Sequence, residues 1–188
     1  LMPGLCGLCS PNHHTPTIDL DAMLDALAYG RATVTERFQA NQVSLGCAHL
    51  GTGGQRALYD SPSATVVFFG YLTEPAIPPG AGEADPASAA RYIHDQYLKR
   101  DKAFLGELMG AFALALWDKR TQTLLLANDR LGMRPVYVAE HKGILLFASE
   151  VKALLQDSSF PRRLDPVAAS EFFHFRYILG DRTFFEDI

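Results

Sequence analysis

Three cysteines and two adjacent histidines are the residues of this sequence whose types and spacing could do chemistry. A cysteine thiolate acts as a nucleophile or as a metal ligand. Cys6, Cys9, His13 and His14 offer the two thiolates and two imidazoles of a zinc site. Adjacent histidines on an irregular Pro/Asn/Thr stretch rarely point at one centre, so we expect no metal there. We expect Cys9 and Cys47 to be small buried core residues.

The composition is that of one ordinary globular domain. A chain of 188 residues can bury one sizeable core, and its 48% of hydrophobic residues includes no apolar run long enough to cross a bilayer. The formal net charge of -4 and the scattered Lys and Arg residues argue against nucleic-acid binding. With three cysteines and no recognisable secretory signal, we expect a protein of the reducing cytoplasm.

Four segments carry helix signals, each a capping residue followed by apolar positions at helical spacing. The first has Leu and Met residues on one face and Gly30 as its stop. A proline in the first helical position strengthens the second and the fourth. The predicted helices, with their N-cap residues, are 17–30 (Thr17 or Asp19), 86–100 (Asp85), 151–155 (Ser149) and 167–177 (Asp165).

Apolar runs bounded by turn residues predict the strands. Two of the turns, at Lys119-Arg120 and at His141-Lys142-Gly143, connect successive strands and predict two hairpins. The Pro- and Gly-rich segment 73–86 is expected to be an exposed loop. Hairpins with helices on both sides indicate an α+β fold with antiparallel sheets. The predicted strands are 42–52, 63–72, 110–118, 121–129, 135–140 and 143–149.

Several segments together resemble the glutamine-hydrolysing N-terminal domain of the asparagine synthetase family. They are LMPGLCGLCS at residues 1–10, GAFALALWDKR at 110–120, ANDRLGMRPVYV at 127–138 and FASEVKALL at 147–155. The resemblance runs from Cys6 to Ile188 and is most specific between Gly110 and Leu155. It implies a four-layer αββα sandwich of two antiparallel sheets flanked by helices, the fold of N-terminal-nucleophile hydrolases.

The same resemblance divides the chain into three parts. Residues 1–5 are expected to be a leader or an expression remnant, and residues 6–160 the amidotransferase-like domain. Residues 161–188 are expected to form a helix and the start of a connection to a synthetase domain that is absent from this sequence. That domain would use ATP and magnesium to activate a carboxylate for amide formation, and none of its residues belongs to the present chain.

The family's nucleophile is an N-terminal cysteine whose own α-amine acts as the catalytic base, and Cys6 is the matching residue. An α-amine with a pKa of about 7.7–8.0 is partly neutral near working pH, whereas an amide nitrogen has no usable basicity. Residues 1–5 precede Cys6, so its nitrogen is an amide. As the sequence stands, we expect Cys6 to lack a base.

Other positions that match the family's site are mostly substituted. The His-Arg-Gly-Pro-Asp motif falls near residues 29–33, which read YGRAT, and none of its five residues is kept. The arginine that receives the substrate carboxylate is replaced by His49, which offers no bidentate fork. The Asn-Gly-Glu motif becomes Phe69-Gly70-Tyr71, so Gly70 keeps its backbone oxyanion donor and Phe69 offers none. The family's Ser-Asp pair falls near Asp85, which we interpret first as a helix cap.

Most of the well-matched residues are interpreted as scaffold. Apolar and turn residues generally serve packing and backbone geometry, so they support the fold more than an activity. We expect Gly132 and Pro135 to set a turn, Phe112, Leu114 and Leu116 to fill a core, and Asp129 and Arg130 to form an internal ion pair.

Three functional hypotheses follow. The leading one is an amidotransferase-like domain without glutaminase activity, serving its own C-terminal synthetase domain in a larger protein, which could be a homodimer. The second is an active glutaminase that supplies ammonia from glutamine once residues 1–5 are removed from Cys6. The third is a small-molecule binding module, because Phe69, Tyr71 and His49 would make the pocket more apolar. We expect no cofactor in this domain.

Overall fold

The computed structural model describes residues 4–10, 18–28, 30, 33–50, 57–74 and 86–188. Nine strands and five helical segments are assigned within these residues. The strands are β1 (Gly4–Cys9), β2 (Thr33–Gln39), β3 (Val43–Leu50), β4 (Leu58–Asp60), β5 (Ala64–Glu74), β6 (Met109–Asp118), β7 (Thr123–Asn128), β8 (Tyr137–His141) and β9 (Ile144–Ala148). The helices are α1 (Leu20–Leu27), α2 (Pro86–Arg100), the 3-10 helix η3 (Asp101–Glu107), α3 (Val151–Leu154) and α4 (Pro166–Phe175).

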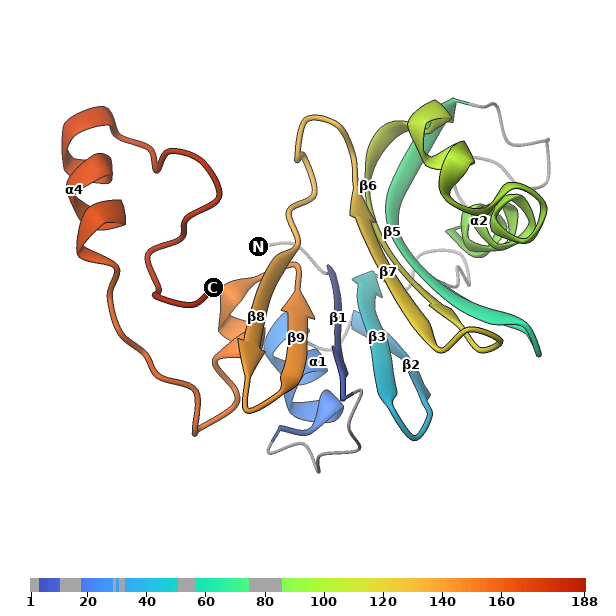
Figure 1. The fold of residues 1–188 in the computed structure, drawn as a ribbon, viewed down its shortest axis with the longest axis horizontal. Helices are drawn as coiled ribbons and strands as arrows, with labels where there is room; N and C mark the ends of the chain where they lie inside the picture. The colour runs from blue at the N-terminus through green and yellow to red at the C-terminus, as the bar shows by residue number, and fades with distance from the viewer. Residues whose placement is uncertain (1–3, 11–17, 29, 31–32, 51–56, 75–85) are drawn as a thin grey trace.

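Two antiparallel sheets stack face to face, with helices on both outer faces (Figure 1). The first sheet has the strand order β2-β3-β1-β9-β8, and the second has the order β4-β5-β6-β7. Helices α1 and α3 cover the outer face of the first sheet, and α2 covers the outer face of the second. The expected α+β fold with a four-layer αββα sandwich is therefore confirmed.

Strand alternation assigns each side chain of β1 to one of two cores. Successive residues of a strand point to opposite faces of the sheet. Leu5 and Cys9 belong to the cluster between the two sheets, with Trp117 and Phe147. Cys6 and Leu8 belong to the cluster under α1 and α3 on the outer face. Because β1 pairs with β3 on one side and with β9 on the other, this alternation is fixed along the strand.

The main elements agree with the sequence predictions. Asp19 caps α1 by accepting the backbone N–H of Asp21 at 3.3 Å, although the helix ends at Leu27, three residues before Gly30. Helix α2 and both predicted hairpins are present, and Cys9 and Cys47 are buried. The sequence pattern does not predict β1, β2 or β4. The first contains two glycines, the second is mostly polar, and the third has three residues.

Ser149 does not cap the helix that follows it, so that prediction is wrong. The residue at the N-cap of α3 is Glu150, which makes no capping hydrogen bond with its side chain. Ser149 Oγ instead accepts the backbone N–H of Leu5 at 3.1 Å, and the Ser149 backbone N–H donates to the Leu5 carbonyl at 2.8 Å. The hydroxyl therefore fastens β1 to the end of β9.

The C-terminal lobe, residues 161–188, stands beside the sandwich (Figure 1). Asp165 caps α4 as predicted, accepting the backbone N–H groups of Val167 at 2.8 Å and Ala168 at 3.0 Å. Within the lobe, the rings of Phe172 and Phe184 meet edge to face at 5.3 Å, so α4 packs against the segment that follows it. Of the helices in the described part of the chain, none has both the length and the apolar character needed to cross a bilayer.

The Asp129 carboxylate organises the loop that crosses from the second sheet to the first. The prediction of an ion pair between Asp129 and Arg130 is wrong. The Arg130 guanidinium donates to the Gly106 carbonyl. Burial alone would raise the pKa of Asp129, but backbone N–H donors hold it below its ordinary value. Gly132 adopts a φ of 65° in the same turn, as a turn glycine should. The donors to Asp129 are Phe112 at 3.3 Å, Leu131 at 3.1 Å, Met133 at 3.0 Å and Arg134 at 3.0 Å.

Asp129→Asn tests this organising role. The substitution keeps the shape but replaces an acceptor oxygen with a donor, so we expect the free energy of unfolding at pH 7 to fall by about 2–4 kcal/mol. The folded pKa of Asp129 lies below its unfolded value of about 3.9. Its stabilising contribution is therefore present above ~pH 4, is lost as pH falls through the folded pKa, and is missing from the variant. Urea unfolding at several pH values measures both effects.

Asp25→Asn is the matched control, because Asp25 is exposed on α1. Its unfolding midpoint should stay close to that of the wild type. An Asp129→Asn variant with unchanged stability would show that the loop is held by other contacts.

Candidate functional site

Most of the sequence-predicted site positions meet at one end of the sandwich, which we call the upper end because it lies at the top of Figure 1. Gly4, where β1 begins, pairs with Ala48 near the end of β3. In the facing sheet, Gly70 near the end of β5 pairs with Phe112 near the start of β6. The segment between β7 and β8 crosses from one sheet to the other at this end. Antiparallel pairing therefore gathers His49, Phe69, Gly70 and Tyr71 here.

The Cys6 thiol does not point into the space between the sheets at that end. Cys6 is 1% exposed and packs in the cluster under α1. Burial raises the pKa of this thiol far above its ordinary value. Because the thiolate is the nucleophilic form of cysteine, a buried thiol that stays protonated is a poor nucleophile.

Residues 4 and 5 are integral to the strand that carries Cys6. The Leu5 side chain is fully buried between the sheets. A Cβ atom on Gly4 would lie 2.4 Å from Ser149 Cβ, so only glycine fits where β1 approaches Ser149. The division of the chain at residue 5 stays a prediction, and residues 1–3 lie outside the described part.

His49 is held in an ion-pair geometry with Glu36. His49 is 7% exposed, and its Nε2 lies 3.1 Å from Glu36 Oε1. The Glu36 carboxylate also accepts the backbone N–H groups of Ala57 at 3.0 Å and Leu58 at 3.2 Å. The Glu36 carboxylate of β2 therefore contacts β3 through the imidazole and the start of β4 through the two backbone N–H groups. A nitrogen already committed to a carboxylate is poorly placed to bind the carboxylate of a substrate.

At Gly70, the backbone of the sheet leaves room for glycine only. Its φ is 122°, and a Cβ atom there would lie 2.1 Å from the Ala111 carbonyl oxygen. Phe69 packs partly into the inter-sheet cluster, and the Arg134 guanidinium lies over its ring at 4.9 Å. Tyr71 is 47% exposed. The Phe69 side chain therefore forms an aromatic platform for Arg134, and the expected match of this position to the oxyanion hole of the family stays a prediction.

Some predicted site residues lie outside the described residues. They include Asp85, the histidines of the zinc hypothesis, and Tyr29, Arg31 and Ala32 of the YGRAT segment. Gly30 has a φ of 64°, and Thr33 begins β2. Among the described residues, no group of three or more His, Cys, Asp or Glu side chains could hold a metal ion.

Sequence reasoning missed three residues of the upper end, Glu36, Arg134 and Ser149. Glu36 stands in a polar strand with no pattern that distinguishes it, and Ser149 looks like a helix cap. Arg134 reaches Phe69 only because Asp129 folds the intervening loop. The orientation of Cys6 could have been inferred from strand alternation, had β1 been predicted.

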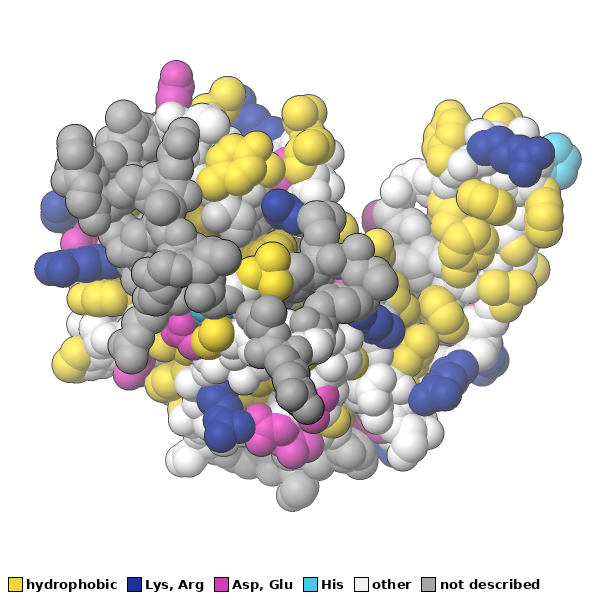
Figure 2. All heavy atoms as spheres, turned by 180° about the vertical axis from the view of Figure 1, so that it is seen from behind, with side chains coloured by type: hydrophobic (Ala, Val, Ile, Leu, Met, Phe, Trp, Pro, Cys, Tyr) yellow, Lys and Arg dark blue, Asp and Glu magenta, His cyan; other side chains and the backbone are white. Residues whose placement is uncertain are grey.

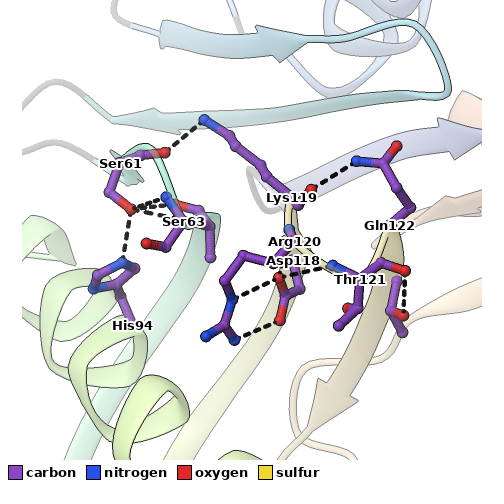
Figure 3. A network of polar contacts seen from close by, with 10 residues as sticks. Ser61, Ser63, His94, Asp118, Lys119, Arg120, Thr121 and Gln122 are labelled. Atoms are coloured by element: carbon purple, nitrogen blue, oxygen red, sulfur yellow. Dashed lines mark hydrogen bonds and ion pairs between the residues drawn. The ribbon is translucent and has the colours of Figure 1, made fainter.

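At another place in the structure, a serine, a histidine and an aspartate have the contacts of a hydrolytic triad. The serine hydroxyl, however, is held by further hydrogen bonds. Ser61 Oγ lies 2.8 Å from His94 Nε2, and His94 Nδ1 lies 2.9 Å from Asp95 Oδ1. Figure 3 shows that Ser61 also belongs to a tight turn. Its Oγ accepts the backbone N–H groups of Ser63 and Ala64, both at 3.1 Å. With its lone pairs committed in this way, Ser61 fastens the turn before β5 to α2.

The lower end of the sandwich, opposite the matched positions, is fastened by charged groups (Figure 3). Lys119 Nζ donates to Asp60 Oδ1 at 2.7 Å and to the Ser61 carbonyl at 2.6 Å. The same ammonium lies 4.8 Å from the ring centroid of Phe38 in β2, so it bridges the two sheets. Beside it, hydrogen bonds from Arg120 hold the pKa of Asp118 well below its usual range.

The comparison with protein families identifies the chain. The family model described as "Glutamine amidotransferase domain" matches residues 86–188, which is more than half of the sequence. The match includes both predicted hairpins and the C-terminal lobe.

Curated relatives point to the same family. Asparagine synthetase [glutamine-hydrolyzing] 2 of Bacillus subtilis (strain 168) is 35% identical over 69 residues, covering 37% of this chain and 9% of the relative. Asparagine synthetase B [glutamine-hydrolyzing] of Escherichia coli (strain K12) is 40% identical over 60 residues, covering 31% of this chain and 11% of the relative. The matched segments thus span about a tenth of these relatives.

A solved structure shares the fold. Glutamine phosphoribosylpyrophosphate amidotransferase from B. subtilis, complexed with ADP and GMP, superposes with a TM-score of 0.63 and 17% sequence identity. The superposition covers 87% of this chain and 46% of that chain. It supports the N-terminal-nucleophile hydrolase fold expected from the sequence. The chain is therefore a member of the glutamine amidotransferase domain family and is related to the asparagine synthetases.

Proposed function

We propose that this domain is silent as a glutaminase and serves a downstream, ATP-dependent amide-forming domain of an asparagine-synthetase-like protein. The observation that carries the proposal is the position of Cys6. It is the third residue of a central strand, with its thiol buried under α1 and its nitrogen inside the chain. Glutamine hydrolysis requires a thiolate that can reach the side-chain amide and a base beside it.

Two further features support the silent assignment. His49 Nε2 is paired with Glu36 where the family places the arginine that anchors the substrate carboxylate. Phe69 stands where the family places the asparagine of the oxyanion hole, and the loss of one such donor typically costs about 100- to 1000-fold in rate. The carboxylate anchor acts in substrate binding, and the oxyanion donor acts in the chemical step. Restoring one of them alone would therefore not restore hydrolysis.

The downstream domain is proposed from the relatives. Those named above are asparagine synthetases several times longer than the matched segments. A synthetase domain of this kind would hold ATP and magnesium, and no residue of the present chain is assigned to them. Three free thiols are consistent with a reducing cytoplasm, which we propose as the location.

The alternative function is an active glutaminase released by removal of residues 1–5. Membership of the family and the retention of Cys6 and Gly70 favour it. Removal would give Cys6 the free α-amine that serves as base. It would also take away Gly4 and the buried Leu5, which pair with Ala48 and Cys47 of β3.

The first test is the intact mass of the purified chain before and after incubation with a diazo-ketone analogue of glutamine, which alkylates an activated nucleophilic cysteine. We expect an unprocessed mass and no adduct, because the Cys6 thiol is buried and has no adjacent base. As a control, iodoacetamide in denaturant should add three groups, one for each free cysteine.

One result would overturn the silent assignment. A species that lacks residues 1–5 and gains a single adduct, with the adduct abolished by Cys6→Ala, would make this domain a processed glutaminase.

The second test asks whether residues 1–5 can be removed without harm to the fold. We expect Leu5→Ala to lower the free energy of unfolding by about 2–5 kcal/mol, because it leaves a cavity between the sheets. Leu50→Ala is the matched control at a half-exposed leucine on β3, with an expected cost of about 1 kcal/mol or less. Urea unfolding of both variants gives the comparison. Equal stability of Leu5→Ala and the wild type would favour a detachable leader.

A further inference from the structure

A pocket opens at the upper end of the domain, where the loop after β7 meets the start of β6. Its volume is about 230 Å³. An apolar cavity of about 150 Å³ is already large enough to hold a benzene molecule. The pocket therefore has room for a small ring that carries one polar group. The lining residues are Leu108, Met109, Gly110, Asp129, Arg130 and Leu131.

The large side chains that line the pocket are mostly apolar. Leu108 is 2% exposed and lies at the inner end, whereas Met109 and Leu131 are 44% and 85% exposed and flank the opening. Hydrophobic side chains also gather on the C-terminal lobe, across a hollow from the body of the domain (Figure 2). The pocket differs from that surface because it encloses a volume and contains an arginine. Small-molecule sites combine an apolar lining with a few polar groups that fix the orientation of the ligand.

The carboxylate in the lining has no hydrogen-bonding capacity left for a ligand. Asp129 is 6% exposed, and its two oxygens accept the four backbone N–H groups described above. A carboxylate has about four lone-pair sites, so these four bonds use them all. Asp129 therefore shapes the pocket without binding what enters it.

The arginine in the lining, in contrast, keeps most of its donors. Arg130 uses one guanidinium nitrogen to donate to the carbonyl of Gly106 in η3, and this bond holds the guanidinium beside the pocket. None of the ion pairs formed within the described part of the chain includes Arg130. The planar fork of an arginine matches the two oxygens of a carboxylate. The polar group that fits this pocket is therefore an anionic acceptor.

We propose that the pocket binds a small monocarboxylate with a compact apolar body, about the size of phenylacetate. The carboxylate pairs with the Arg130 guanidinium, and the apolar body lies against Leu108, Met109 and Leu131. Such a ligand satisfies both the charged and the apolar part of the lining. None of the lining residues is a position matched to the glutamine site, so this binding requires nothing of the amidotransferase chemistry.

A titration with phenylacetate, followed through the methyl resonances of ¹³C-labelled methionine, tests the site. We expect the Met109 methyl resonance to shift with a Kd of about 1 mM or less, as a ligand of about ten non-hydrogen atoms allows. Met23 is fully buried under α1 and serves as the internal reference, which should not shift. Phenylacetamide has the same shape without the charge, and we expect it to bind about 10-fold more weakly or worse.

Substitutions identify the two parts of the site. Arg130→Gln removes the charge but keeps a donor for the Gly106 carbonyl, so it should weaken phenylacetate binding about 10-fold or more and leave phenylacetamide binding nearly unchanged. Arg162→Gln is the matched control, because Arg162 is also an exposed arginine that donates to a backbone carbonyl, that of Leu155 at 2.8 Å. Leu131→Ser should weaken the binding of both ligands, because it removes apolar area from the lining. Circular dichroism and thermal unfolding verify that each variant is folded.

Any of three results would contradict this assignment. The first is a Met109 methyl resonance that phenylacetate does not shift at several times the expected Kd. The second is phenylacetamide binding as tight as phenylacetate binding, which would leave an apolar pocket without preference for an anion. The third is an Arg130→Gln variant that binds phenylacetate as tightly as the wild type and the Arg162→Gln control do.

Discussion

The pairing of β1 between β3 and β9 is the constraint on which the rest of the structure depends. A central strand has both edges hydrogen-bonded, so it cannot slip by one residue without turning every side chain to the opposite face. In this register Leu5 fills the core between the sheets, and Cys6 fills the core under α1. The chemical character of Cys6 follows from this register, because burial under the helix keeps the thiol protonated and out of reach.

The two ends of the sandwich are held in different ways. At the lower end, Lys119 joins the β6-β7 turn to Asp60 and to the ring of Phe38, and so ties one sheet to the other. At the upper end, His49 is tied to Glu36 and Phe69 lies under Arg134. The residues that the sequence matches to the family's site are thus engaged in contacts within the protein. This is the arrangement on which the proposal of a silent domain rests.

The residues that hold this scaffold also shape its surface. Asp129 gathers four backbone N–H groups, and the loop that it fixes places Leu131 and Met133 at the surface. The lobe is likewise fixed from within, by the Asp165 cap and by the contact of Phe172 with Phe184. Local polar and aromatic contacts thus fix both the loop after β7 and the C-terminal lobe.

The sequence by itself determined the elements whose signals are local. Periodic apolar residues, the Asp19 and Asp165 caps and the hairpin turns act over a few residues, and the residues between Gly110 and Leu155 were specific enough to identify the family. Only the tertiary structure decided that Ser149 holds Leu5 and that Asp129 binds backbone N–H groups, because their partners are distant in sequence or depend on how a loop folds. It also decided the orientation of Cys6. A strand with two glycines carries too weak a pattern to reveal its register, which is set by pairing with β3 and β9.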